Sequence, residues 1–350
     1  MSGKVFNKGK NLVVSLRSTP GIKENKVVQW NSVVRCIRYS FPHFGMLALA
    51  LLLYTTCSSS TKADEGGTSF WLPGQYGSFA AVAPEPGPSL ALVSYWYSAS
   101  ANADEPLGFG ENLKLGVDAD YFGQFIVPAY TLDTTFLGGR PSFSLAFIPA
   151  RNKVSAGISI GSVSASGSDD VTGISDLYPT AQLFWNRGVH NWMAYVTGNI
   201  PVGSYKSSRL SNLGLGHAAI DIGGAYTFLN PETGWEFSAT AGLTYNFRNS
   251  DTDYKNGIDA HLDLGVSKFV TDRMYVGLVG FAYQQLTADS GQPAILGDFK
   301  GRTFGIGPQI GWIFDAGGTE VFANLRGYKE FNVKNRVEGG GVMFTISIPL

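Results

Sequence analysis

Apolar and polar side chains alternate along much of the chain, most regularly over residues 235–248. The apolar positions of this stretch are Trp235, Phe237, Ala239, Ala241, Leu243, Tyr245 and Phe247. A period of two predicts a β-strand with one apolar and one polar face. The strand exceeds the about five or six residues usual in globular sheets and suits the roughly 9 to 11 residues with which a tilted strand crosses a bilayer. The pattern therefore predicts a transmembrane β-barrel, with a soluble β-sandwich as the alternative.

Further segments of this kind are separated by turn residues. The clearer ones predict strands at 174–187, 191–204, 216–229, 234–247, 257–270, 274–287, 302–314, 319–330 and 336–350. Weaker candidates precede them at 88–99, 113–121, 122–133, 141–149 and 153–163, and Pro128 interrupts one of these. Connections between the later strands alternate between short and long, which is typical of short periplasmic turns and longer outer loops. We therefore predict an all-β fold, an antiparallel transmembrane barrel of about 12 to 14 strands.

The alternation also assigns side chains to the inside of the predicted barrel. His217 and Asp221 point inward from one strand, and Asp259, His261 and Asp263 point inward from the next strand but one. Charged groups are tolerated on a water-filled inner face, whereas on the lipid face they are costly. These residues are interpreted either as an ordinary polar lining or as a constriction that orients a passing molecule.

The segment before the first strand, residues 64–87, does not alternate. It contains Phe70, Trp71 and Tyr76 among glycines and prolines. This composition favours a compact apolar element, which would act as a hatch or plug in the lumen. The alternative is a helical turn seated at the periplasmic or interfacial rim of the barrel.

Residues 1–63 have a different character from the rest. They are basic, with Glu24 as the single acid, and end in the apolar run from Phe44 to Tyr54 followed by small residues. This is the pattern of a signal peptide with an extended basic region, and we predict removal up to residue 63. Both cysteines, Cys36 and Cys57, would be lost with it. A lipid-modified Cys57 is the alternative.

Composition narrows the function classes. Charged residues make up 15% of the chain and the formal net charge is -1, so there is no electrostatic footprint for nucleic acid. Asp251, Asp253 and Asp298 lie in predicted loops and could bind a cation, but no full 12-residue calcium-loop pattern is present and solvated loops explain these acids more simply. An enzymatic Ser/His/acid set would need a serine at the depth of His217 or His261, and none is evident. We expect no catalytic residues, no bound metal and no cofactor.

Several short strings carry a resemblance to a known family. They are DEGGTSFWLPG from Asp64, ISDLYPT from Ile174, IPVGSY from Ile200, FLNPETGWEFSA from Phe228, NSDTDYKNG from Asn249, DSG and LGDFKG between Asp289 and Gly301, and GIGPQ from Gly305. Together they resemble the bacterial outer-membrane family that is associated with the meta-pathway of phenol degradation. The resemblance covers residues 64–350.

The resemblance implies a channel in the bacterial outer membrane for passive uptake of small hydrophobic or aromatic compounds, similar to fatty-acid and toluene channels. The expected partners are outer-membrane lipid, the transported molecules and the outer-membrane assembly machinery. A structural or surface-interaction barrel with a blocked lumen is the alternative. In the channel interpretation Phe70, Trp71 and Tyr76 form a transient apolar site, and His217, Asp221, Asp259, His261 and Asp263 line the lumen.

Overall fold

The computed structural model describes residues 69–106, 112–160, 163–291 and 300–350. All described residues belong to one compact unit, Ser59–Leu350. The predicted signal peptide, residues 1–63, lies outside the described residues. In the described ranges no helix is long and apolar enough to span a membrane.

The described residues form β-strands joined by turns and loops. The strands are β1 (Gly87–Pro106), β2 (Asn112–Thr131), β3 (Arg140–Ala146), β4 (Pro149–Ile160), β5 (Val163–Ile174), β6 (Tyr178–Arg187), β7 (His190–Gly198), β8 (Ala219–Asn230), β9 (Trp235–Asn246), β10 (Tyr254–Lys255), β11 (Asp259–Thr271), β12 (Met274–Gln285), β13 (Ser290–Gly291), β14 (Arg302–Asp315), β15 (Glu320–Lys334) and β16 (Glu338–Pro349). The short β10 and β13 pair with each other, apart from the main sheet.

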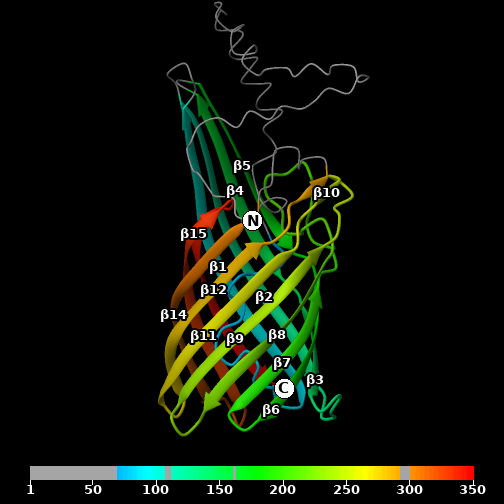
Figure 1. The fold of residues 1–350 in the computed structure, drawn as a ribbon, viewed down its shortest axis with the longest axis vertical. Coiled ribbons are helices and arrows are strands. Elements are labelled where there is room, and N and C mark those ends of the chain that lie inside the picture. The colour runs from blue at the N-terminus through cyan, green and yellow to red at the C-terminus, as the bar shows by residue number, and fades with distance from the viewer. Residues whose placement is uncertain (1–68, 107–111, 161–162, 292–299) are drawn as a thin grey trace, which may run out of the picture. The chain divides into compact units, whose positions relative to one another are not determined.

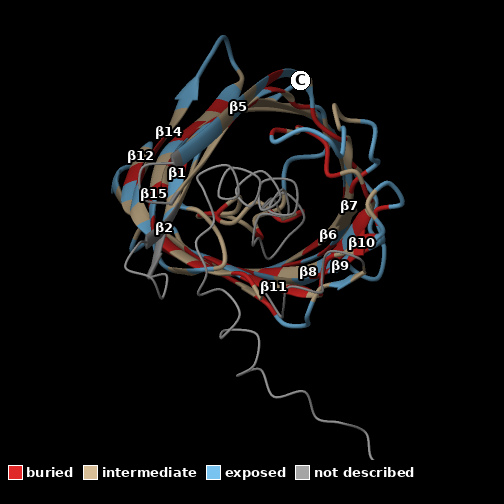
Figure 2. Cartoon of the chain, turned by 90° about the horizontal axis from the view of Figure 1, so that it is seen from above, coloured by how far each residue is buried: buried red, intermediate tan, exposed pale blue. Residues whose placement is uncertain are grey.

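The main sheet closes on itself as an antiparallel barrel of 12 strands (Figures 1 and 2). The order around the ring is β1, β16, β15, β14, β12, β11, β9, β8, β7, β6, β3 and β2, and β1 pairs with β2 to complete it. The β4–β5 hairpin extends this sheet along β2. Closure leaves the ring without an open edge, as a barrel in lipid requires. The barrel prediction is confirmed, and the β-sandwich alternative is wrong.

The ring has 12 strands, the lower end of the predicted range, because two predicted strands are one and because the predicted strand 153–163 is β4, which lies outside the ring in the β4–β5 hairpin. Residues 113–121 and 122–133 belong to the single continuous strand β2, so their separation was wrong. Pro128 pairs with Leu90 of β1. On its other side β2 meets the joint between β3 and β4, where the ladder is reduced to the isolated bridge between Ile126 and Phe147. A proline is tolerated there because its missing N–H costs no regular ladder bond.

The sequence reasoning also missed β5. This strand is rich in serine, glycine and aspartate, so it lacks the alternation that marks the others. The predicted strand 174–187 is divided, because β5 ends at Ile174 and β6 begins at Tyr178. Between them the buried Asp176 carboxylate accepts hydrogen bonds from the Asn199 side chain at 2.7 Å and from the backbone N–H groups of Gly203 at 2.9 Å and Leu215 at 3.1 Å. Asp176 thereby anchors the long connection between β7 and β8.

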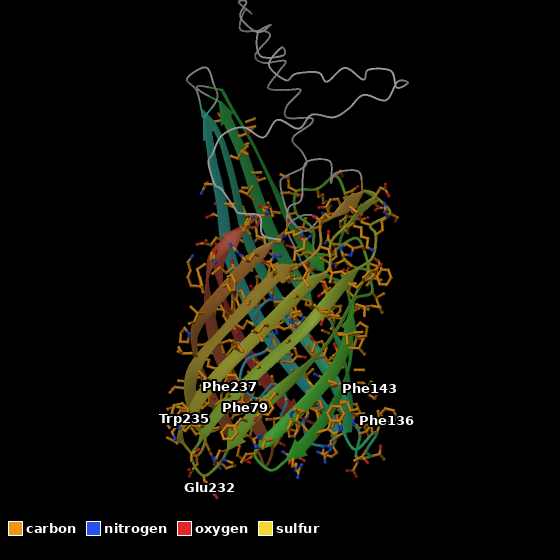
Figure 3. All side chains as sticks on the ribbon, viewed as in Figure 1. Phe79, Phe136, Phe143, Glu232, Trp235 and Phe237 are labelled. Carbon is orange, nitrogen blue, oxygen red and sulfur yellow. The ribbon has the colours of Figure 1, made fainter. Side chains whose placement is uncertain are left out.

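The two faces of the barrel follow the alternation in the sequence. On β9, Trp235 is 51% exposed and Leu243 53% exposed on the outer face, whereas Glu236 and Asn246 are buried on the inner face. Trp235 and Phe237 lie near the end of the barrel that carries the short turns (Figure 3). Aromatic side chains at strand ends around an apolar band are the usual surface of outer-membrane barrels. A closed barrel with this outer face places the protein in the bacterial outer membrane.

Candidate functional site in the barrel lumen

Residues 69–86, which we call the lumen segment, lie inside the ring of strands and outside its hydrogen-bond ladder. Several of their backbone N–H groups donate to side chains of the barrel wall. Gly74 and Tyr76 donate to the Asp263 carboxylate at 2.9 and 3.1 Å, and Phe79 donates to Glu236 at 2.9 Å. Because unpaired buried N–H groups are costly, these inward-facing carboxylates replace the ladder partners that an irregular segment lacks.

The lumen segment also contacts β14 and β15, which follow β11 and β12 around the ring. Arg326 of β15 donates to the Gln75 carbonyl at 2.6 Å, and the Tyr328 hydroxyl donates to the Gly74 carbonyl at 2.8 Å. Gln309 of β14 donates to the Ser78 hydroxyl at 2.7 Å. Together with the hydrogen bonds to β9 and β11, these contacts hold the segment along one arc of the ring, from β9 to β15.

One residue of the lumen segment has an unusual backbone conformation. Phe79 has a φ of 65°, a left-handed conformation that non-glycine residues rarely adopt and that costs about 1 to 2 kcal/mol. Its ring packs edge-on against Tyr275, with the centroids 5.0 Å apart, and near Phe322. The contacts of its ring and the hydrogen bond of its N–H group to Glu236 hold this conformation in place.

Trp71 is the most deeply buried large side chain of the lumen segment, with 1% of its surface exposed. Its indole stacks on the His261 ring of β11, with the ring centroids 3.4 Å apart and the planes 13° from parallel. Tyr195 of β7 and Tyr76 lie nearly parallel to the indole, each with its centroid 5.8 Å away. The same cluster includes Phe184, Met193 and Ala225. We call this space the indole pocket.

A buried polar network forms the wall beneath the indole. The Asp221 carboxylate of β8 accepts hydrogen bonds from the Tyr195 hydroxyl at 2.7 Å, the Thr244 hydroxyl at 2.6 Å and His261 Nε2 at 3.0 Å. Since an ionised carboxylate only accepts hydrogen bonds, Nε2 of His261 carries a hydrogen. Three donors compensate the cost of burying the Asp221 charge.

Two polar atoms of the indole pocket have no hydrogen-bond partner. They are Nδ1 of His261 and Nε1 of Trp71, and both are buried. The two rings lie face to face, so the in-plane nitrogen of one does not point at the nitrogen of the other. The indole therefore fills the pocket sterically and leaves polar groups unsatisfied.

Glycine at two wall positions leaves room for the rings of the pocket. A Cβ added at Gly242 of β9 would lie 2.7 Å from His261 Nε2 and would overlap the Tyr195 hydroxyl. A Cβ at Gly223 of β8 would overlap the same hydroxyl and the Ala241 carbonyl. Any side chain at these positions would displace Tyr195 or His261, so the pocket depends on both glycines.

The structure brings together some of the residues predicted for the site. Trp71, Tyr76, Asp221, His261 and Asp263 form one continuous cluster of the lumen segment and the wall.

The remaining predicted residues lie apart from this cluster. Phe70 packs with Leu215 and Ala219. His217 lies near Asn256, with its Nε2 3.4 Å from the Asn256 amide nitrogen. Asp259 accepts a hydrogen bond from Asn246 at 2.9 Å.

Comparison with known proteins identifies the family. The family model described as putative MetA-pathway of phenol degradation matches residues 99–346. The chain belongs to this family. No curated protein matches the sequence.

Comparison with solved structures bears on the fold of this family member. The COG4313 outer membrane channel from Pseudomonas putida F1 is 16% identical in sequence and superposes with a TM-score of 0.54, covering 79% of this chain and 99% of that one. A Pseudomonas aeruginosa FadL homologue is 9% identical, with a TM-score of 0.42 and a coverage of 83% of this chain and 97% of that one. The first of these shows that the chain has the fold of an outer-membrane channel.

Within this member of the family, sequence reasoning missed several residues of the pocket. Tyr195 lies on β7, where Asn191, Met193 and Tyr195 share the inner face. Their alternation with Trp192 and Val196 carried the signal for an inward tyrosine. That Tyr195 meets Asp221 and His261 follows from the pairing of β7 with β8, of β8 with β9 and of β9 with β11.

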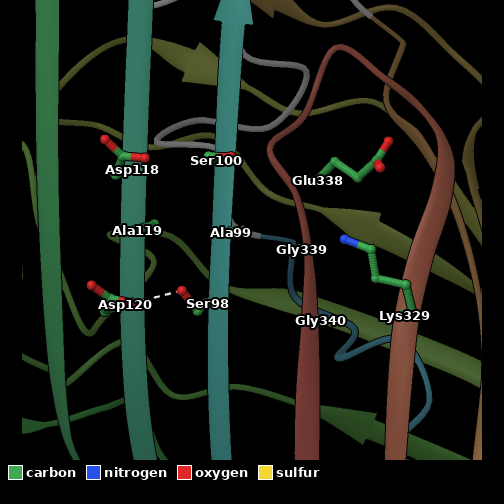
Figure 4. A pocket seen from close by; sticks show the side chains of 10 residues that line it. All are labelled: Ser98, Ala99, Ser100, Asp118, Ala119, Asp120, Lys329, Glu338, Gly339 and Gly340. Atoms are coloured by element: carbon green, nitrogen blue, oxygen red, sulfur yellow. Dashed lines mark hydrogen bonds between the residues drawn. The ribbon is translucent and has the colours of Figure 1, made fainter.

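Two other polar sites of the described residues show fewer features of a binding site than the indole pocket does. A cavity of about 430 Å³ beside β1, β2, β15 and β16 is lined by Ser98, Ala99, Ser100, Asp118, Ala119, Asp120, Lys329, Glu338, Gly339 and Gly340 (Figure 4). In the loop predicted as a possible cation site, the Asp253 carboxylate forms an ion pair with Arg248 at 2.5 Å, and Asp298 lies outside the described residues. No group of three or more His, Cys, Asp or Glu within the described ranges could hold a metal ion.

Proposed function

We propose that this protein is a channel for passive uptake of small hydrophobic or aromatic compounds across the outer membrane. The observation that carries the proposal is the aromatic lining of the lumen, where Trp71, Tyr76 and Tyr195 stack within one pocket. Aromatic surfaces provide a transient apolar site for small hydrophobic molecules inside an otherwise polar lumen. Membership in a family associated with phenol degradation supports the same cargo class.

In this proposal the lumen segment acts as a hatch. It is not part of the sheet, so it can move without breaking a strand pairing, and its wall contacts are individual hydrogen bonds. Passage then requires that the segment shifts within the lumen or leaves it. The proposed removal of residues 1–63 would place the new N-terminus close before this segment.

Uptake measurements test the channel function. A bacterial strain that lacks the gene is compared with the same strain complemented by the full chain, and the initial rate of labelled phenol or toluene uptake is measured. We expect complementation to raise the rate several-fold, with uptake of a labelled hydrophilic sugar as the control. Equal rates of aromatic uptake with and without the protein would contradict the proposal.

A structural barrel with a blocked lumen is the second candidate, favoured by the hydrogen bonds that tie the lumen segment to several strands of the ring. Conductance in planar lipid bilayers separates the two. A channel conducts after residues 69–86 are deleted, whereas a structural barrel with a blocked lumen stays silent. Heat-modifiable migration on a gel verifies that the deletion variant is folded.

The signal peptide is a further proposal. Mass spectrometry of the protein purified from outer membranes is expected to show an N-terminus at Asp64 and no lipid on Cys57. A chain that retains residues 1–63, or that begins at a lipid-modified Cys57, would contradict it.

A further inference from the structure

We propose that the outer face of β14 and β15 carries a binding site for a phosphate group of lipopolysaccharide, the glycolipid of the outer leaflet, and that Arg302 and Lys334 hold this phosphate between them. The site lies on the lipid-facing side of the barrel wall, so it is separate from the lumen and from any molecule that passes through it. The proposal depends on the location of the barrel in the outer membrane and not on its proposed function.

Arg302 lies at the outer boundary of the apolar band of the barrel. The even-numbered side chains of β14 from Phe304 to Phe314 face outward and are all apolar, whereas Thr303 and Gln309 are buried on the inner face. The ten steps between these phenylalanines, at about 3.3 Å each and tilted by about 40°, span about 25 Å, which is the height of such a band. Arg302 is the next outward-facing residue, at the end of β14 that follows the long connection from β12. It is therefore at the level of the lipid headgroups of the outer leaflet.

A β-bulge places a second cation directly opposite Arg302. The pairing of β14 with β15 shifts by one residue between Arg302 and Phe304. Phe304 lies opposite Phe331, but Arg302 lies opposite Lys334, whereas an unshifted register would bring Val333 to this position. Directly opposite residues of an antiparallel pair have their side chains on the same face. The extra residue of β15 therefore gives Arg302 an exposed lysine as its neighbour in place of a valine.

Neither cation of this pair has an ionic partner among the described residues. Nη2 of Arg302 donates a hydrogen bond to Oδ1 of Asn332 at 2.9 Å, which is a neutral acceptor. The ion pairs of the described ranges involve other residues. Like charges directly opposite each other destabilise a pair of strands. A phosphate between them replaces this repulsion by attraction and accepts hydrogen bonds from the guanidinium and the ammonium together.

The surface next to the two cations, toward the middle of the membrane, suits the acyl chains of a lipid. The Phe304 and Phe331 rings stack with their centroids 5.9 Å apart. Phe331 is 47% exposed and the adjoining Ile306 is 53% exposed on the outer face. A cationic pair beside an exposed apolar surface matches a lipid with a phosphorylated headgroup. In the outer leaflet of the bacterial outer membrane this lipid is lipopolysaccharide, whose glycolipid anchor carries phosphate groups.

Lys329 is a third outward-facing cation of β15, but its surroundings differ. It shares the cavity beside β1, β2, β15 and β16 with three carboxylates, those of Asp118, Asp120 and Glu338 (Figure 4). These negative charges offset the charge of the lysine and repel a phosphate. The phosphate site is therefore confined to the pair of Arg302 and Lys334, and Lys329 provides a control on the same strand and the same face.

Titration of the purified, detergent-solubilised protein with fluorescently labelled lipopolysaccharide tests the proposal. The double variant Arg302→Gln/Lys334→Gln removes both cations, and we expect its affinity to be about 30-fold lower than that of the wild type. Lipopolysaccharide stripped of its phosphate groups should bind the wild type about 30-fold more weakly as well. The double variant should not distinguish the stripped from the intact glycolipid, because it lacks the groups that bind phosphate.

The double variant Lys329→Gln/Lys268→Gln is the matched control, since it also removes two outward-facing cations. Lys268 lies over the Trp235 ring, with its Nζ 5.4 Å from the ring centroid, at the end of the barrel that carries the short turns. The affinity of this control for lipopolysaccharide should stay within about threefold of that of the wild type. The control thereby separates a phosphate site from a general effect of net charge.

Lipid analysis of the protein extracted from outer membranes in a mild detergent identifies the bound lipid. We expect lipopolysaccharide to be retained by the wild type and by the control variant, and to be lost from Arg302→Gln/Lys334→Gln. Retention of phosphatidylglycerol in place of lipopolysaccharide would overturn the proposal.

The proposal is also overturned if folded Arg302→Gln/Lys334→Gln binds lipopolysaccharide within about threefold of the wild type, or if the control variant loses as much affinity as it does. Equal binding of intact and phosphate-free lipopolysaccharide by the wild type has the same consequence. Heat-modifiable migration establishes folding. If the double variant does not fold, Lys334→Gln is titrated alone, because this side chain is exposed. Its affinity should fall about fivefold, and an unchanged affinity overturns the proposal.

Discussion

Replacing Asp263 by alanine is the sharpest test of how the lumen segment is held. The buried Asp263 carboxylate accepts hydrogen bonds from the backbone N–H groups of Gly74 and Tyr76, at 2.9 and 3.1 Å. Both donors belong to the lumen segment, and the acceptor belongs to β11. Asp263→Ala therefore removes both hydrogen bonds to the lumen segment and leaves the backbone hydrogen bonds between β11 and its neighbouring strands unchanged.

The size of the effect follows from the two bonds. A hydrogen bond to a charged group contributes about 1.5 to 3 kcal/mol, so the pair contributes about 3 to 6 kcal/mol. Part of this is offset, because the variant no longer buries a carboxylate. A net loss of about 2 to 3 kcal/mol would raise the population with a released segment by a factor of about 30 to 150.

If the segment is a hatch as proposed, single-channel recording in planar bilayers measures that population as the fraction of time the lumen conducts. Glu330→Ala is the matched control: Glu330 is also a buried inner-face carboxylate, but it accepts hydrogen bonds from Gly339 N–H at 2.7 Å and from the Tyr97 hydroxyl at 2.8 Å, both in the barrel wall. We expect Asp263→Ala alone to raise the open fraction and the rate of chymotrypsin cleavage within residues 69–86. An open fraction within twofold of the wild type, or an equal rise in both variants, would refute the reasoning.

Three further predictions concern the barrel itself. Gly242→Ala should lower the temperature at which the barrel unfolds, as followed by heat-modifiable migration on a gel, by several degrees, because the new Cβ would lie 2.7 Å from His261 Nε2. Gly157→Ala is the control and should leave this temperature unchanged, since its Cβ would lie no closer than 3.9 Å to any neighbour. Leu264→Arg, on the outer face near the middle of β11, should lower the free energy of unfolding in liposomes by about 2 to 4 kcal/mol. Val270→Arg, near the end of the same strand, should lower it by about 0 to 1 kcal/mol. Equal losses would contradict the assigned depth of the two residues in the membrane. Asp176→Ala removes three hydrogen bonds to the β7–β8 connection and should speed its proteolysis at least tenfold, and an unchanged cleavage rate would show that this carboxylate does not anchor it.

Much of the barrel was predictable because each strand carries its own signal, the alternation of apolar and polar side chains along the sequence. The alternation of β9 indicated both its length and its two faces, since a strand between lipid and lumen must present apolar and polar side chains in turn. A strand that does not lie between lipid and lumen need not alternate apolar and polar side chains, so its sequence does not predict it. The serine- and glycine-rich β5 was missed for this reason, and Pro128 within β2 was misinterpreted because the broken ladder beside it is not visible in the sequence.

For the candidate site, too, the sequence predicted some features and only the structure showed the others. The sequence by itself determined that Trp71 lies in a non-alternating apolar segment and that Asp221, His261 and Asp263 face inward. Only the tertiary structure decided that Trp71 stacks on His261 and that Asp263 holds the lumen segment, because these contacts join residues nearly two hundred positions apart. Strand periodicity specifies the face on which a side chain lies, whereas the order and register of the strands around the closed ring specify which inward side chains meet.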